Sequence, residues 1–206
     1  MAAVEERVRR WIATSKQNVF LNAAEDEVLY GGAAGGGKSD ALLIFSILRR
    51  MTVPKSRGLI LRRKFPELER SLILRSRDFL TGAARWRDKQ HRWEFPNGSI
   101  LEFGYCESEK DVYQYHSAEY EDICIDELTQ FTEFQYKYLL SRLRTTKRGV
   151  RCFMRSATNP GNVGHGWVKA RFIDIAPPNT VYRDPESGLT RRFILATLDD
   201  YPHIDK

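Results

Sequence analysis

One stretch of the chain has the residue types and spacing of a loop that holds phosphate groups: Gly32, Ala33, Ala34, Gly35, Gly36, Gly37, Lys38 and Ser39. It fits the pattern G-x-x-x-x-G-K-[ST] without a gap. Glycines let the backbone turn so that successive N–H groups point at phosphate oxygens. In this pattern the lysine contacts the β and γ phosphates and the following hydroxyl binds Mg²⁺. We therefore expect a nucleoside triphosphate here, with Lys38 on its phosphates and Ser39 on Mg²⁺.

Two adjacent carboxylates, Asp126 and Glu127, follow the short apolar run from Ile123 to Ile125. Triphosphate hydrolysis needs one carboxylate to hold the metal and another group to orient water. Neighbouring side chains at the end of a strand point to opposite sides. We therefore expect Asp126 to face the metal through Ser39 and Glu127 to activate water, which favours hydrolysis over phosphoryl transfer. The alternative is that both are ordinary acids in an acidic segment.

A third polar segment, Ser156 to Gly161, follows the next apolar run, Val150 to Met154. Polar side chains at that strand end would lie beside the γ phosphate and could respond to its loss. The alternative is a capped turn, because Asn159-Pro160-Gly161 is good turn chemistry.

Alternating strand and helix patterns predict the elements that must position these residues. Short apolar runs predict strands, and periodic segments between them predict helices. The predicted strands are 28–30, 59–61, 123–125, 150–154 and 193–196, and the predicted helices begin near residues 4, 39, 66 and 136, the first ending near Thr14. Pro96-Asn97-Gly98-Ser99 between two alternating runs predicts a β-hairpin near 91–105, inserted at the sheet edge. The pattern favours a three-layer α/β fold with a mostly parallel central sheet.

Charge is strongly segregated along the chain. Residues 57–92 hold eleven Lys or Arg and four acids, 93–133 hold one Lys and eleven acids, and 134–192 hold twelve Lys or Arg and three acids. Such blocks favour a polyanion on the basic parts, although solvated faces are also charged. The residues that could contact DNA phosphates are Arg62, Arg63, Lys64, Arg75, Arg85, Arg87, Lys147 and Arg148.

Length and composition set limits on the class of protein. The 206 residues fit one domain, and 42% hydrophobic residues allow a substantial core. The longest apolar stretch, 41–48, is too short to span a membrane, and the acidic start does not resemble a secretory signal. Three cysteines without close spacing fit neither a disulfide framework nor a zinc site. We expect no membrane association and a cytoplasmic location.

Three segments in order resemble the large subunit of tailed-bacteriophage terminase, the ATPase of the DNA-packaging motor. They are the phosphate loop, Ile-Cys-Ile-Asp-Glu-Leu-Thr-Gln-Phe at 123–131, and Ser-Ala-Thr-Asn-Pro-Gly at 156–161. The resemblance also covers 61–68, 141–144 and 197–202, and so spans nearly the whole chain.

The resemblance implies a RecA-like ATPase of the class with an additional strand and a catalytic glutamate. It implies that Glu127 and Lys38 are catalytic, that residues 32–39 bind ATP, that Ser39 and Asp126 bind Mg²⁺, and that Thr158 and Asn159 couple hydrolysis to motion. Gln17 resembles a glutamine that reads adenine, and an ordinary surface glutamine is the alternative. The loop lacks the early basic residue of many terminases, and 113–120 lacks the arginine that some relatives insert into a neighbouring site; Arg142 and Arg144 are possible substitutes.

The implied partners are double-stranded DNA, other copies in a ring, the terminase small subunit and the portal of a procapsid in the bacterial cytoplasm. Terminase large subunits usually continue into a nuclease domain, so we expect residues 1–206 to form an ATPase domain incomplete at its C-terminus, without endonuclease activity. Two other functions stay open, a helicase-like DNA-dependent ATPase and a truncated fragment that binds nucleotide or DNA without turnover.

Overall fold

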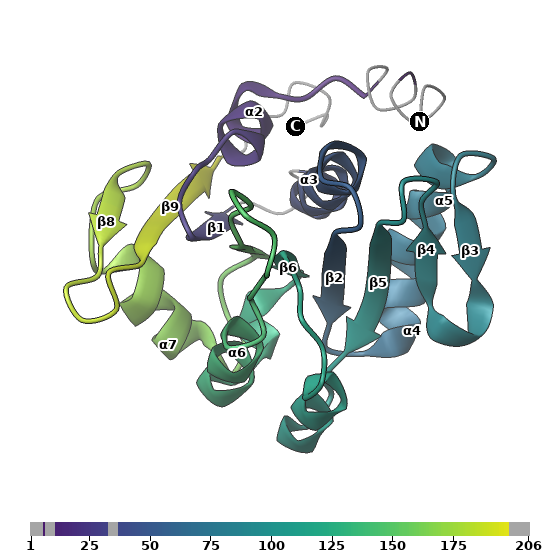
Figure 1. The fold of residues 1–206 in the computed structure, drawn as a ribbon. Coiled ribbons are helices and arrows are strands. Elements are labelled where there is room, and N and C mark those ends of the chain that lie inside the picture. Colours follow the sequence, from purple (N-terminus) through teal and green to yellow (C-terminus); the bar gives the residue numbers. More distant parts are fainter. Residues whose placement is uncertain (1–5, 7–10, 33–36, 198–206) are drawn as a thin grey trace, which may run out of the picture.

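A nine-stranded sheet is the centre of the part of the chain that the structure, a computed structural model, describes: residue 6 and residues 11–32 and 37–197 (Figure 1). The strand order is β3-β4-β5-β2-β6-β7-β1-β9-β8. The strands are β1 (Glu27–Gly32), β2 (Arg57–Arg62), β3 (Arg85–Arg87), β4 (Arg92–Glu94), β5 (Ile100–Tyr105), β6 (Asp122–Ile125), β7 (Phe153–Thr158), β8 (Val181–Arg183) and β9 (Thr190–Ala196).

Six neighbouring strands, in the order β5-β2-β6-β7-β1-β9, are parallel to one another. The pairs at the two edges of the sheet, β3-β4, β4-β5 and β8-β9, are antiparallel. This confirms the predicted α/β class and its mostly parallel sheet. The predicted hairpin is present as β4 and β5, but β5 is not an insertion. It pairs in parallel with β2 and therefore belongs to the central sheet.

Helices cover both faces of the sheet, which gives the three expected layers (Figure 1). The helices packed on one face are α2 (Ser15–Leu21), α3 (Lys38–Thr52), α4 (Phe65–Leu68), the π-helical turn η1 (Glu69–Ile73) and α5 (Leu74–Leu80). The other face carries η3 (Glu109–Tyr115), α6 (Glu133–Leu140), α7 (His165–Val168) and η5 (Lys169–Ile173). Among the described residues, no helix is long and apolar enough to cross a membrane.

Alternation along each strand divides the core between these two faces. In β1, Val28 and Tyr30 join the cluster with α3, while Leu29 joins the cluster with α6 and η5. The same alternation places Ile60 under α3 and Leu59 on the opposite face. A strand buried on both faces needs apolar residues at consecutive positions, and these are the runs that the sequence shows.

Two local predictions differ from the structure. The residues 150–152 precede β7, which extends to Thr158, so the polar segment 156–158 is itself part of the strand. Most of the predicted N-terminal helix falls outside the described residues; residues 11–14, at its predicted end, are not helical, and α2 begins at Ser15. The side chains of Thr14 and Gln17 form a reciprocal capping box at its start. That T-x-x-Q spacing is a helix-start signal visible in the sequence.

A buried ion pair fixes α3 on the sheet. Arg50 and Asp122 are fully buried and form an ion pair, and Asp122 also accepts a hydrogen bond from Ser46 at 2.8 Å. A Cβ at Gly58 would lie 1.7 Å from Nη1 of Arg50, so only glycine leaves room for the guanidinium. The pair joins the helix that follows the phosphate loop to β6, the strand that precedes the two carboxylates.

We predict that Asp122→Ala lowers the free energy of unfolding by about 3–5 kcal/mol, because it leaves the Arg50 charge buried without an acidic partner. Urea denaturation followed by circular dichroism measures this change. Asp174→Ala, which breaks the exposed pair with Lys169, is the control and should cost at most about 1 kcal/mol. Equal losses in the two variants would contradict the structural role of the Arg50–Asp122 pair.

Candidate active site

The phosphate loop begins and ends on two glycines that the surrounding backbone requires. Gly32 ends β1 with φ of 127°, and a Cβ there would lie 2.0 Å from the backbone oxygen of Ala196. Gly37, with φ of 58°, is the residue before α3. Ala33, Ala34, Gly35 and Gly36 lie outside the described residues. The loop therefore connects the carboxyl end of a central parallel strand to the start of a helix, as its sequence predicts.

The two predicted metal ligands lie together. Ser39, in the first turn of α3, has its Oγ 3.0 Å from both carboxylate oxygens of Asp126. Asp126 follows β6 and is 1% exposed. Lys38 is also buried, and burial lowers its pKa while the nearby charges of Glu127 and Asp126 act in the opposite direction. The structure thus brings the predicted lysine, hydroxyl and two carboxylates to one place.

Glu127 diverges from Asp126 because its backbone adopts a left-handed conformation, with φ of 55° and ψ of 52°. Such a conformation is strained for a residue other than glycine. The Oε1 atom accepts a hydrogen bond from Nδ2 of Asn159 at 3.3 Å. Burial and the Asp126 charge raise the pKa of Glu127, whereas Arg62, Lys38 and Asn159 lower it. The carboxyl group is therefore directed at β7 and held there.

Thr158 and Asn159 reach this site because β7 lies between β1 and β6 in the sheet. Thr158 is opposite Gly31 of β1 in the parallel register. An additional strand between the phosphate-loop strand and the carboxylate strand is therefore present. A mostly apolar cavity of about 350 Å³, lined by both residues and by Phe193 and Leu195, adjoins them.

Thr129 was not singled out from the sequence, although it connects the carboxylate loop to the end of β7. Its Oγ1 lies 2.9 Å from Oγ1 of Thr158 and 3.2 Å from the backbone oxygen of Asn159. Its backbone oxygen accepts from Gly164 at 2.7 Å, just before α7. The signal available in the sequence was its position two residues after Glu127.

Arg62, one of the residues that could contact DNA according to the sequence, lies next to Asp126. It ends β2 beside β6, and its Nε and Nη2 lie 2.8 and 2.7 Å from Oδ2 of Asp126. This guanidinium therefore lies inside the candidate site, paired with a carboxylate, and a contact between Arg62 and DNA stays a prediction. The pairing of Leu61 with Ile125 puts the next residues of the two strands, Arg62 and Asp126, side by side.

Gln17 lies against the end of the phosphate loop and is 4% exposed, so it is not an ordinary surface residue. Its Nε2 donates to the backbone oxygen of Gly37 at 3.0 Å, and its Oε1 accepts from the backbone N–H of Thr14 at 2.8 Å. The side-chain nitrogen of Gln17 therefore has one further N–H to donate, and its oxygen can accept one further hydrogen bond. A contact with adenine stays a prediction.

The acidic segment is largely paired with the basic segments that flank it in sequence. These ion pairs are Arg87–Glu94, Arg57–Glu102, Arg144–Glu119, Lys147–Glu121, Lys137–Glu133 and Arg62–Asp126. Of the predicted DNA contacts, Lys64, Arg85 and Arg148 are exposed and make no ion pair with a described residue. Charge segregation in the sequence thus partly reflects pairing within the fold.

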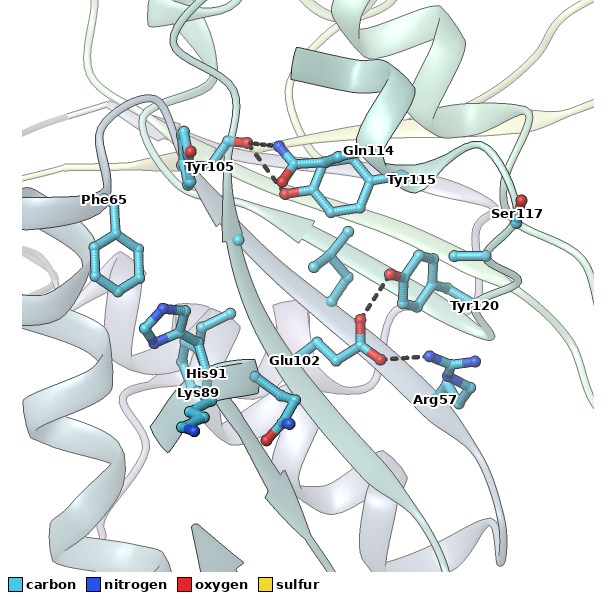
Figure 2. A pocket seen from close by; sticks show the side chains of 15 residues that line it. Arg57, Phe65, Lys89, His91, Glu102, Tyr105, Gln114, Tyr115, Ser117 and Tyr120 are labelled. Carbon is cyan, nitrogen blue, oxygen red and sulfur yellow. Dashed lines mark hydrogen bonds and ion pairs between the residues drawn. The ribbon is translucent and has the colours of Figure 1, made fainter. Parts of the chain in front are cut away.

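A second pocket, of about 420 Å³, lies along β2 and β5 (Figure 2). Figure 2 shows the carboxylate of Glu102 between Arg57 and Tyr120, whose hydroxyl donates to it at 2.8 Å. The ring centroids of Phe65 and His91 lie 4.3 Å apart near the other end, with the ring planes tilted by 48°. None of the described residues predicted to bind phosphate or metal lines this pocket, so it is separate from the site formed by Ser39 and Asp126.

The donors at the phosphate loop fit Mg²⁺. This ion prefers oxygen ligands and usually takes one or two from protein, with phosphate and water completing the shell. The adjacent hydroxyl of Ser39 and carboxylate of Asp126 are such a set. No cluster of three or more His, Cys, Asp or Glu that could enclose a metal occurs among the described residues. A shared site, completed by a bound triphosphate, is therefore the arrangement that these residues suit.

Fold and site together define a P-loop nucleoside triphosphatase domain with an additional strand. Among solved structures, the large terminase of the thermophilic bacteriophage D6E superposes with a TM-score of 0.74 at 14% identity, over 95% of this chain and 48% of that protein. The chain thus spans about half the length of that relative, which has also been solved with ADP. The Thermus phage P74-26 large terminase ATPase domain gives 0.68 at 14% identity, over 95% and 85% of the two chains.

The N-terminal domain of the DNA packaging ATPase from bacteriophage phi29 gives a TM-score of 0.53 at 19% identity, over 85% of this chain and 92% of that one. A comparison with curated protein sequences finds no significant match. The family described as phage terminase large subunit matches residues 23–192. The chain belongs to the phage terminase large subunit family.

We predict that Thr129→Val lowers the free energy of unfolding by about 1–3 kcal/mol, because it removes a buried hydroxyl bonded to the end of β7. Denaturant titration measures the change. Thr146→Val, at an exposed position, is the control and should stay within about 0.5 kcal/mol of the unsubstituted chain. A loss in Thr129→Val no larger than in this control would show that the Thr129 hydroxyl does not join the two segments.

Proposed function

We propose that this chain hydrolyses ATP and that the hydrolysis drives double-stranded viral DNA into a procapsid, as the ATPase of a terminase large subunit. One observation carries the proposal. Lys38, Ser39, Asp126, Glu127 and Asn159 converge where three parallel strands end, around the phosphate loop. Family membership supports the link from this chemistry to packaging.

The residues divide the work of hydrolysis according to their positions. The backbone of residues 32–37 and the ammonium of Lys38 bind the phosphates. Ser39 and Asp126 would hold Mg²⁺, which neutralises charge on the β and γ phosphates when bound. Glu127 orients the attacking water and accepts its proton, and its raised pKa makes it a stronger base than an exposed glutamate. Gln17 is proposed to contact adenine from beside Gly37.

Thr158 and Asn159 are proposed to couple hydrolysis to movement. Asn159 is bonded to Glu127, so loss of the γ phosphate and the attacking water would change its surroundings first. Thr129 bonds to both Thr158 and Asn159 and, through Gly164, to the start of α7. A change at the phosphate can therefore pass from β7 to a helix on the outer layer through hydrogen bonds.

The proposed partners follow from the family. They are double-stranded DNA, further copies of the chain in a ring, the terminase small subunit and the procapsid portal, within the host cytoplasm. The proposal assigns ATP turnover to residues 1–206. A motor that moves along any sequence should contact phosphates and not base edges.

We predict that Glu127→Gln lowers ATP turnover by roughly 10²- to 10⁴-fold and leaves ATP binding nearly unchanged, because only the base is lost. Release of phosphate measures turnover, and equilibrium binding of labelled ATP measures affinity. Glu133→Gln, which changes an exposed glutamate paired with Lys137, is the matched control. Normal turnover in Glu127→Gln would remove its assigned role.

We predict that affinity for double-stranded DNA falls with salt, with a log–log slope of about −0.9 for each phosphate neutralised. Arg85→Ala should make the slope shallower by about 1, because Arg85 is exposed and unpaired among the described residues. Arg75→Ala should change it less, because Arg75 already pairs with Asp40 and Asp78. An affinity that does not vary with salt would exclude a phosphate-based grip.

The packaging role is tested by mixing the chain with procapsids, small subunit and DNA. We expect ATP to make the DNA resistant to added nuclease, and Lys38→Ala to abolish this protection. ATP turnover that needs DNA but gives no protection would favour a helicase-like ATPase, and absence of turnover under every condition would favour a binding fragment.

A further inference from the structure

We propose that Arg62 occupies the metal side of the site before nucleotide arrives, as a cation that Mg²⁺ must displace from Asp126. The proposal rests on the proposed function, because it concerns how Mg²⁺ and nucleotide enter that site. It assigns to Arg62 a role in positioning Asp126 and in setting the Mg²⁺ requirement.

The first step is the burial of Asp126. Its side chain is 2% exposed, and a second carboxylate, Glu127, is its neighbour. An ionised carboxylate without compensation is costly in such surroundings. The compensation comes from the Arg62 guanidinium, which places two nitrogens on the same oxygen, Oδ2, at 2.8 and 2.7 Å.

The second step is that the contacts of Asp126 are divided between two elements. Arg62 approaches Oδ2 from the end of β2, and the Ser39 hydroxyl lies 3.0 Å from both oxygens on the side of the phosphate loop. Nε of Arg62 donates a hydrogen bond to Oδ2 and Nη2 lies 2.7 Å from the same oxygen, so the guanidinium charge is held against it. A divalent ion bound through Ser39 and Asp126 therefore meets a fixed positive charge on the carboxylate that it must use.

The third step is the charge count around the site. Lys38 and Arg62 balance Asp126 and Glu127, so these four groups carry no net charge. Entry of Mg²⁺ next to Arg62 brings like charges together, and this repulsion is strong where water is excluded. Arg62 is only 17% exposed at its side chain, so solvent screens it weakly. Movement of the guanidinium off Oδ2 relieves the repulsion.

The ion pair with Asp126 belongs to Arg62 and not to its basic neighbour, Arg63. The next arginine turns away, and its Nη1 donates to the backbone oxygen of Gln130 at 2.6 Å. Among the described residues, it makes no ion pair with a carboxylate of the site. Arg63 therefore supplies a matched control with the same chemistry and neighbouring position.

The experiment titrates Mg²⁺ into the full chain at a fixed concentration of fluorescent ADP and records nucleotide binding. In Arg62→Gln the Mg²⁺ concentration for half-maximal binding should fall by about 10-fold, because the competing charge is gone. Arg62→Lys keeps a charge and should stay closer to the unsubstituted chain, and Arg63→Gln should stay within about 2-fold of it. Binding in EDTA, measured in parallel, separates the effect on metal from any effect on the nucleotide itself.

An Mg²⁺ requirement in Arg62→Gln that equals or exceeds that of the unsubstituted chain would overturn the proposal. Failure of the unsubstituted chain to bind ADP at all would instead overturn the proposed function. If Arg62→Gln does not fold, displacement can be tested by NMR on the unsubstituted chain, by measuring the hydrogen exchange of the Arg62 Nε–H. Its exchange with water should become faster when Mg²⁺ and ADP are added together, and unchanged protection would contradict displacement.

Discussion

The buried carboxylate of Asp126 is the constraint around which the site is organised. A charge that is removed from water must be compensated by partners in fixed positions. Asp126 finds them in Ser39 of α3 and Arg62 of β2, while its own position is set by β6. Three elements that are distant in sequence are therefore held at one point, and the ends of the phosphate loop and the neighbouring Glu127 are placed relative to that point.

Buried carboxylates at the starts of β6 and β1 are likewise paired with arginines. Asp122, at the start of β6, pairs with Arg50 in the last turn of α3. Glu27, at the start of β1, is fully buried and pairs with Arg171 and Arg191. The pairs of Arg50 and Arg171 join α3 and η5 to β6 and β1, the strands whose opposite ends carry the carboxylates and the phosphate loop. Acidic and basic segments that are separate in sequence thus become neighbours in the fold, and fewer cations remain for DNA than the charge blocks indicate.

The sequence was sufficient for features that depend on neighbouring residues. The phosphate-loop pattern and the buried runs before Asp126 and Thr158 located the strands that carry the site, and the alternation of elements predicted the sheet. The role of Arg62 was not predictable, because it depends on pairing between β2 and β6, 64 residues apart along the chain. Thr129 depends likewise on its contact with Thr158. The helix α2 was not predicted, although its capping box, Thr14 and Gln17, lies within four consecutive residues. The signal was therefore present in the sequence and was not used.

In the proposed function, Glu127 and Asn159 extend the arrangement from binding to turnover, since the backbone of Glu127 is strained into position and Asn159 holds its carboxylate. All of this depends on Asp126 serving as the metal ligand. Electron paramagnetic resonance with Mn²⁺ in place of Mg²⁺ measures that dependence directly. The unsubstituted chain should bind one Mn²⁺ only when ADP is present, and Asp126→Ala should lose this binding while remaining folded. Equal Mn²⁺ binding by a folded Asp126→Ala variant would contradict the account.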